Sequence, residues 1–166
     1  MKAIELHPAY PGAIWTSSLR GSPVSGNNEV GRSLGQDVVS YVARNYYECV
    51  SGEVVLQDYY IALRFTLPED FVAWADGNAI LVEYRTESGT YINSHVDLYI
   101  YKSGVATLIS SNENNANTDW SVISIDDSAL GSWSAGDIVE IYLKLETRSW
   151  YYARVGKIRF EYISNN

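Results

Sequence analysis

The fold is decided by a stretch near the C-terminus in which every second residue is apolar, Val139-Glu140-Ile141-Tyr142-Leu143-Lys144-Leu145-Glu146. Side chains of a strand point alternately to its two sides, so a period of two predicts a strand with one buried face. The same alternation recurs in Tyr59–Phe65, Ile80–Arg85, Val96–Tyr101 and Ile158–Tyr162. Shorter candidate strands are Asn45–Val50, Ala106–Ser110 and Ser121–Ile125. This series predicts an all-β fold, an antiparallel β-sandwich with a jelly-roll-like topology, and an immunoglobulin-like sandwich is the second choice.

The alternation of apolar residues changes phase within the last predicted strand, which contains Ile158–Tyr162. Its apolar residues occupy odd positions up to Val155 and even positions from Ile158 onward. An extra residue in the strand restores the phase, and glycine is common at such sites. We therefore expect a β-bulge at Val155-Gly156.

One segment between strands has a helical pattern. Leu67-Pro68-Glu69-Asp70 places proline and two carboxylates where a first helical turn accepts them. Phe71 and Trp74 then lie three residues apart, and Gly77 suits a helix end. We expect one short helix over residues 67–77.

Residues 1–44 differ in composition from the rest of the chain. They contain three of the four prolines and few aromatic residues. We interpret residues 1–44 as an extended N-terminal arm and residues 45–166 as the β-sandwich domain. Because the arm has little periodicity, we expect it to be ordered by contacts with its own domain or with a neighbouring subunit, through His7, Tyr10 and Trp15.

The composition and net charge of the chain exclude some classes of protein and argue against others. The 166 residues include one cysteine, 14 tyrosines and a net charge of −8. One thiol excludes an internal disulfide framework, and the acidic balance argues against nucleic acid as the main partner. Met1–Pro8 lacks the apolar run of a signal peptide, and no stretch is apolar for the length of a membrane span.

Catalytic signatures are absent from the sequence. His7, His95 and Cys49 lie in no known catalytic motif, and we expect no catalytic residue, no metal ligand and no cofactor. Glu83 and Glu140 are the one pair of mid-strand carboxylates that a glycosidase mechanism would use, but solvated strand faces are the better interpretation. The loop Asn112–Asp119 has the oxygens of a calcium site without its spacing, so we interpret it as a polar loop.

Aromatic residues at turns are the candidate binding residues. The set is Trp15, Trp120, Trp133, Trp150, Tyr151 and Tyr152. Exposed rings of this kind either stack on sugars or anchor a subunit interface. A sugar-binding groove would draw its rings from Trp74 as well as from these tryptophans.

Charge is distributed unevenly along the chain. Residues 51–100 carry a net −6, whereas Lys144–Arg159 contains five basic residues and one acid. Such patches steer copies of a chain together, unless folding pairs them within one subunit.

Several short stretches carry a resemblance to a group of virion proteins. They are His7–Ala13, Asn45–Glu48, Leu56–Tyr59, Gly136–Val139 and Gly156–Phe160. With these, the chain resembles short jelly-roll proteins of uncultivated phages. The resemblance implies a virion structural role, as a capsid decoration protein or a fibre component, and implies no catalytic residues.

We therefore expect a non-enzymatic virion protein that forms a homo-oligomer, as a trimer, on a capsid or tail protein. It would be made in the host cytoplasm and located in the virion. One alternative is a carbohydrate-binding module or receptor-binding head, with a glycan as the partner. Another is an extracellular filament subunit whose arm completes a neighbour's sheet.

Overall fold

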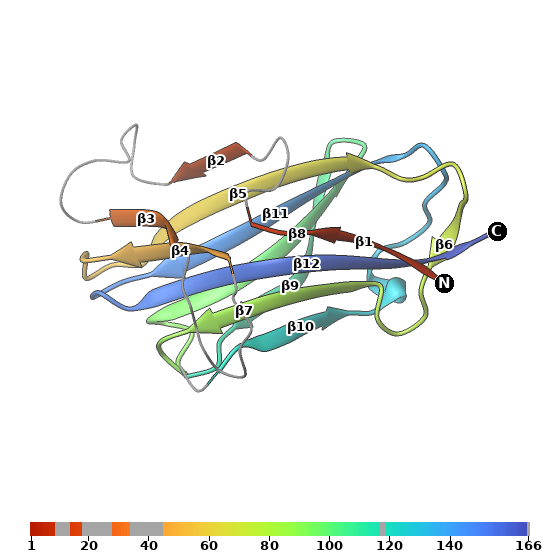
Figure 1. Ribbon diagram of the computed structural model, residues 1–166. Helices are drawn as coiled ribbons and strands as arrows, with labels where there is room; N and C mark the ends of the chain where they lie inside the picture. Colours follow the sequence, from red (N-terminus) through yellow and green to blue (C-terminus); the bar gives the residue numbers. More distant parts are fainter. Residues whose placement is uncertain (9–13, 18–27, 34–44, 117–118, 166) are drawn as a thin grey trace.

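The computed structural model describes residues 1–8, 14–17, 28–33, 45–116 and 119–165, and these form two antiparallel β-sheets packed face to face (Figure 1). Sheet A contains β1 (Lys2–Leu6), β3 (Asn28–Ser33), β4 (Tyr46–Ser51), β6 (Phe71–Trp74), β7 (Ile80–Thr86), β10 (Ser121–Ile125) and β12 (Tyr152–Ser164). Sheet B contains β2 (Ile14–Ser17), β5 (Gln57–Thr66), β8 (Ser94–Lys102), β9 (Val105–Glu113) and β11 (Ile138–Thr147). The predicted β-sandwich is confirmed.

Each sheet is organised around one long strand. In sheet A, β12 pairs with β4 and β1, and also with β7 and β6. In sheet B, β11 lies between β5 and β8, with β2 and β9 outside them. From β4 onward the chain crosses repeatedly between the two sheets, which is how a sandwich buries both inner faces at once.

The core lies between the sheets and is built from the alternating residues. Its largest fully buried side chains are Phe160, Ile61, Leu63, Leu67, Ile80, Leu98, Ile141, Leu143, Leu145 and Ile158. On β11 the burial alternates strictly from Val139 to Leu145, as the sequence predicts. The intervening residues of β11 therefore form the outer face of sheet B.

The bulge in β12 is confirmed. Val155 lies opposite Tyr84, whereas Ile158 lies opposite Val82, so β12 has one extra residue in this interval. Gly156 is buried there, and a Cβ atom at this position would lie 3.2 Å from Trp120 Cζ3. The bulge thus returns Ile158 to the core and leaves room for the Trp120 ring.

The predicted helix over residues 67–77 is wrong. Within the part of the chain that the structure describes there is no α-helix, and only Asp127–Ala129 forms one turn of 3-10 helix. Phe71–Trp74 is instead the strand β6, in which Ala73 pairs with Ile163 but Phe71 pairs with Ser164. Val72 is the extra residue of this irregularity, so the three-residue spacing of Phe71 and Trp74 comes from a bulge that turns both rings inward.

The described parts of the N-terminal segment join the sheets of their own chain. β1 pairs with β12, β2 with β5, and β3 with β4. Ile4 and Leu6 also pack against the core. The expected boundary between residues 44 and 45 borders a range outside the described residues, so this division into arm and domain stays a prediction.

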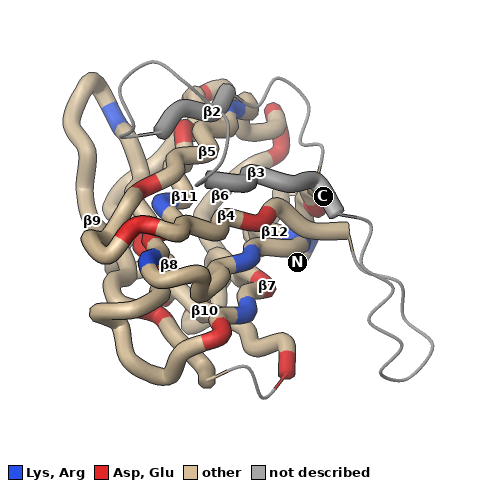
Figure 2. Tube along the Cα trace, turned by 90° about the vertical axis from the view of Figure 1, so that its left-hand side faces the viewer, with Lys and Arg blue, Asp and Glu red and all other residues tan. Residues whose placement is uncertain are grey.

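Several basic residues of the C-terminal stretch form ion pairs within the chain. Arg154 pairs with Glu48, Arg159 lies 2.8 Å from Glu5, and Lys144 lies 3.0 Å from Glu146. Figure 2 shows basic and acidic positions interspersed over both sheets. Lys144 also lies 3.9 Å from Asp58 of the acidic region, so at this point folding pairs the two charged regions within one subunit.

Membrane-spanning helices can be assessed for the described ranges only. No helix in those ranges is long and apolar enough to cross a membrane.

Candidate functional site on the outer face of sheet B

The outer face of sheet B gathers tyrosines and charged side chains from three neighbouring strands. Antiparallel register places Tyr142 opposite both Ala62 and Tyr99, and places Lys144 opposite both Tyr60 and Asp97. We call this surface the tyrosine face. Its residues are Asp58, Tyr60, Ala62 and Arg64 of β5, His95, Asp97, Tyr99 and Tyr101 of β8, and Glu140, Tyr142, Lys144 and Glu146 of β11.

One end of the tyrosine face is aromatic. The rings of Tyr101 and Tyr142 are 4.6 Å apart between centroids and inclined by 42°. Leu108 of the edge strand β9 pairs with Tyr99 and leaves 49% of its surface exposed. All four tyrosines are half-buried, so each ring is held by its neighbours while part of it stays open to solvent.

The hydroxyls of Tyr60 and Tyr142 are hydrogen-bond donors at neutral pH. Burial raises the pKa of Tyr60, although the nearby Lys144 ammonium, 5.8 Å from the ring centroid, acts in the opposite direction. Burial raises the pKa of Tyr142 too, and the neighbouring Glu140 adds to this shift. A protonated phenol both donates and accepts, which suits recognition of hydroxyl groups.

The other end of the tyrosine face is a cluster of charges. His95 Nε2 lies 2.7 Å from Glu146 Oε2 and 3.7 Å from Asp97 Oδ2. Lys144 Nζ lies 3.0 Å from Glu146 Oε2 and 3.9 Å from Asp58 Oδ2. His95 and Asp97 are buried although they belong to an outer face, so their charges must be balanced by one another.

The protonation states follow from this balance. Burial lowers the pKa of His95, but hydrogen bonds with Asp97 and Glu146 outweigh burial and raise this pKa to about 9. Burial raises the pKa of Glu146 and of Asp97, yet the hydrogen bonds of both with His95 leave each pKa below its usual value. The cluster is therefore an ionised network at neutral pH.

Two of the predicted binding aromatics have structural contacts. Trp133 is only 8% exposed, donates from Nε1 to Leu130 O at 2.8 Å and packs edge-on against the buried Trp74. Trp120 is half-buried, 5.6 Å from the Tyr46 ring and close to Gly156. Trp74 and Trp133 are therefore core residues and not exposed rings.

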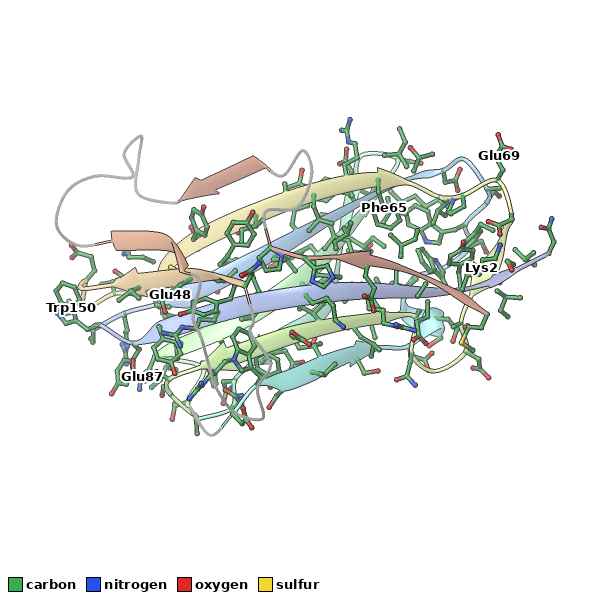
Figure 3. All side chains as sticks on the ribbon, viewed as in Figure 1. Lys2, Glu48, Phe65, Glu69, Glu87 and Trp150 are labelled. Atoms are coloured by element: carbon green, nitrogen blue, oxygen red, sulfur yellow. The ribbon has the colours of Figure 1, made fainter. Side chains whose placement is uncertain are left out.

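The other predicted aromatics lie at the turn between β11 and β12. Trp150 is 61% exposed at one end of the sandwich, where Figure 3 shows it, and its ring covers Gly52. Ser149 and Trp150 both have positive φ, as a tight hairpin turn requires. Tyr151 and Tyr152 are half-buried, and the Arg154 guanidinium lies 3.9 Å from the Tyr152 ring centroid.

The predicted arm contacts are only partly visible. His7 is exposed, with Nε2 3.8 Å from Glu5 Oε2 of its own chain. Tyr10 lies outside the described residues. Trp15 pairs through its backbone with Ile61 of β5, and its side chain also lies outside the described residues.

The residues that the sequence analysis considered for catalysis lie on different faces of the sandwich. Cys49 belongs to the inner face of sheet A, with Sγ 3.4 Å from Thr147 Oγ1, whereas His95 belongs to the outer face of sheet B. Glu83 and Glu140 lie on opposite outer faces of the sandwich, and Glu140 pairs with Arg64.

The polar loop before β10 is tied to the sheet by its own side chains. Asn115 Oδ1 accepts from the backbone N of Thr86 at 2.8 Å, and Asn115 Nδ2 donates to Ser121 Oγ at 3.0 Å. These bonds occupy the Asn115 amide in holding the described part of the loop to β7 and β10.

Cys49 is expected to resist thiol reagents. Burial raises the pKa of its thiol to about 11, from an ordinary value of 9.0. Below pH 9 its thiolate fraction is therefore about 100-fold lower than in the unfolded chain. Because the unfolded thiol ionises first, stability also falls as the pH rises from about 9 to about 11. Labelling with Ellman's reagent at pH 8, with and without denaturant, measures the first effect, and equal rates would contradict it.

Sequence reasoning recognised the outward positions of the tyrosine face but did not select them as a site. One feature of the sequence that could have indicated the site is that three strands carry tyrosine at outward positions. These tyrosines are Tyr60, Tyr99, Tyr101 and Tyr142. A second signal was His95 two residues before Asp97, which places both on one side of a strand. Neither signal shows that β5, β8 and β11 are neighbours, since strand order is a tertiary property.

Comparisons with known proteins find similar β-sandwich folds among solved structures. No protein-family model matches the chain, and no curated protein matches its sequence. Among solved structures, the carbohydrate-binding module TmCBM61, in complex with β-1,4-galactotriose, shares 9% identity at a TM-score of 0.53, covering 90% of this chain and 88% of that one. The shared feature is the β-sandwich fold.

Two further solved structures have lower scores. The family 11 carbohydrate-binding module from Clostridium thermocellum, in complex with a β-1,3-1,4-mixed-linked tetrasaccharide, has 13% identity and a TM-score of 0.42, covering 99% of this chain and 90% of that one. The enzymatically active domain of tailspike protein 4 from bacteriophage CBA120 has 9% identity and a TM-score of 0.42, covering 87% of this chain and 19% of that one.

Proposed function

We propose that this protein binds a carbohydrate chain through the tyrosine face. The observation that carries the proposal is the gathering of Tyr60, Tyr99, Tyr101 and Tyr142 beside charged side chains on one outer face. A half-exposed ring offers a flat apolar surface to the C–H side of a pyranose, while phenol and charged groups bond its hydroxyls. The sandwich fold shared with a module that binds β-1,4-galactotriose agrees with this proposal.

The dimensions of the face suit a short stretch of glycan. Along β11, Lys144 comes four positions after Glu140, so the rows from Tyr101 to Tyr60 extend over roughly 13 Å. We propose binding without catalysis, because the carboxylates of the face are engaged in ion pairs, Glu140 with Arg64 and Glu146 with His95. A β-linked oligosaccharide is the proposed ligand class, by analogy with the module of similar fold that was solved with β-1,4-galactotriose.

The test is a glycan array followed by calorimetric titration of the best soluble ligand. Tyr99→Ala and Tyr142→Ala are each expected to weaken binding about tenfold, since each removes a stacking ring worth about 1 kcal/mol or more. Tyr142→Phe keeps the ring and should retain most of the affinity.

Trp150→Ala is the matched control, because it removes an exposed ring at the turn after β11 and not one of the tyrosines of the face. A loss of binding in Trp150→Ala with normal binding in the tyrosine variants would place the site at the turn and overturn the proposal. An array without any bound glycan would overturn it as well.

A virion structural role is the second candidate function. It is favoured by an exposed apolar tip of Trp150, Val54 and Val55 at one end of the sandwich. Val54 and Val55 lie in one turn and Trp150 lies in another. A backbone hydrogen bond of 2.6 Å from Ser149 N to Glu53 O joins these two turns, so the tip is continuous. Light scattering over a range of concentrations tests assembly, and a monomer at every concentration would exclude it.

A further inference from the structure

Three metal-ligating side chains converge at the charged end of the tyrosine face. His95, Asp97 and Glu146 each offer one ligand atom, and these atoms lie within 4.8 Å of one another. His95 and Asp97 come from the same side of β8, and Glu146 lies directly opposite His95 on β11. Two adjacent strands of the sheet therefore hold the three groups in a fixed arrangement.

Backbone atoms orient the side chains of His95 and Asp97 by bonding to Nδ1 of the histidine and Oδ1 of the aspartate. His95 Nδ1 lies within hydrogen-bond distance of Tyr91 O, and because a carbonyl only accepts, Nδ1 must carry the proton. Asp97 Oδ1 accepts from the backbone N of Asn112 at 2.7 Å. His95 Nε2 and Asp97 Oδ2 are thus left facing Glu146, which is the outer-sphere arrangement found around metal ligands.

The spacing of the ligand atoms suits a small divalent ion. Zinc bonds of about 2.0–2.2 Å in a tetrahedron place neighbouring ligand atoms about 3.4 Å apart. His95 Nε2 lies 2.7 Å from Glu146 Oε2 and 3.7 Å from Asp97 Oδ2, on either side of that value. The ligand atoms of Asp97 and Glu146 lie within 4.8 Å of each other, so these two carboxylates must approach by up to about 1.4 Å to close the set around an ion.

The local charge also favours a cation. Once His95 is neutral, Asp58, Asp97 and Glu146 carry three negative charges against the one ammonium of Lys144. Lys144 Nζ lies 3.9 Å from Asp58 Oδ2, so Lys144 has a second carboxylate to pair with when Glu146 turns to a metal. The cluster can therefore accept two positive charges without leaving the lysine unpaired.

We propose that His95 Nε2, Asp97 Oδ2 and Glu146 Oε2 bind a divalent transition-metal ion, with Zn²⁺ the best match to one imidazole and two carboxylates. On binding, His95 gives up its Nε2 proton to solvent and the nitrogen lone pair bonds to the metal. This inference does not rest on glycan binding, because its test measures metal binding without any glycan present.

The test is equilibrium dialysis of the folded full chain against Zn²⁺, with Co²⁺ as a spectroscopic probe. The wild-type protein is expected to bind one Zn²⁺, to give the visible absorption of tetrahedral Co²⁺, and to unfold at a higher temperature with Zn²⁺. Asp97→Asn and His95→Gln should weaken binding by about tenfold or more, because each removes a ligand. Circular dichroism confirms that each variant is folded.

His7→Gln and Glu140→Gln are the matched controls, since they remove the other histidine and another β11 carboxylate. Unchanged binding in both controls supports the assignment. Loss of binding in His7→Gln, or wild-type binding in Asp97→Asn and His95→Gln, would overturn it. A wild-type protein that retains no Zn²⁺ would also overturn it and would leave the cluster as an ion-pair network alone.

Discussion

Replacing Phe160 with alanine is expected to lower the free energy of unfolding by about 4 kcal/mol. Phe160 is fully buried in β12, and its ring lies 4.5 Å from that of Phe65 and 6.4 Å from that of Trp74. Phe65 belongs to sheet B and Phe160 to sheet A, so the truncation opens a cavity where the two sheets meet. Urea denaturation followed by tryptophan fluorescence measures the change.

Phe160→Leu is the matched variant, because it keeps an apolar side chain of similar volume. Its expected cost is smaller, about 1–2 kcal/mol, since less of the cavity is left empty. Val122→Ala, at a residue 56% exposed on the edge strand β10, should change stability by less than about 0.5 kcal/mol. Equal stability of Phe160→Ala and Val122→Ala would contradict the described core.

Glu146→Gln is expected to lower the free energy of unfolding by about 3 kcal/mol. The measurement is made with a chelator present, so that no metal ion is bound. The carboxylate of Glu146 accepts from His95 at 2.7 Å and from Lys144 at 3.0 Å. The amide of glutamine removes the negative charge and leaves these two cations with fewer partners in a region with little access to water. Chemical denaturation at neutral pH measures the loss.

Glu140→Gln on the same face of the same strand is the control. Glu140 pairs with Arg64, whose side chain is 67% exposed, and such pairs contribute about 0–1 kcal/mol. The two substitutions are chemically identical and differ in the burial of the partner. Equal costs would show that the His95 cluster is not desolvated as the structure describes.

Much of the fold was predictable because strand periodicity is local. In β11, the alternation from Val139 to Glu146 gives both the strand and its buried face. The phase change at Gly156 likewise predicted a bulge, which the register of β12 with β7 confirms. In both cases the information lies within a few residues of one strand.

The predictions that failed depended on distant partners. Phe71 and Trp74 have a spacing that is typical of a helix, but pairing with the C-terminal end of β12 turns the segment into a bulged strand. Trp133 occupies a loop, where an exposed ring is expected, yet it packs against Trp74 in the core. Nothing near these residues in the sequence shows what they contact.

By itself, the sequence determined an all-β sandwich, its main strands and which side chains point inward, because alternation along a strand is read from neighbouring residues. Only the tertiary structure decided that β5, β11 and β8 lie side by side, and thereby that Tyr60, Tyr142 and Tyr99 share a face and that Glu146 meets His95. The physical reason is that strand order and register depend on pairing between segments far apart in the chain, where burial of the whole core selects one arrangement.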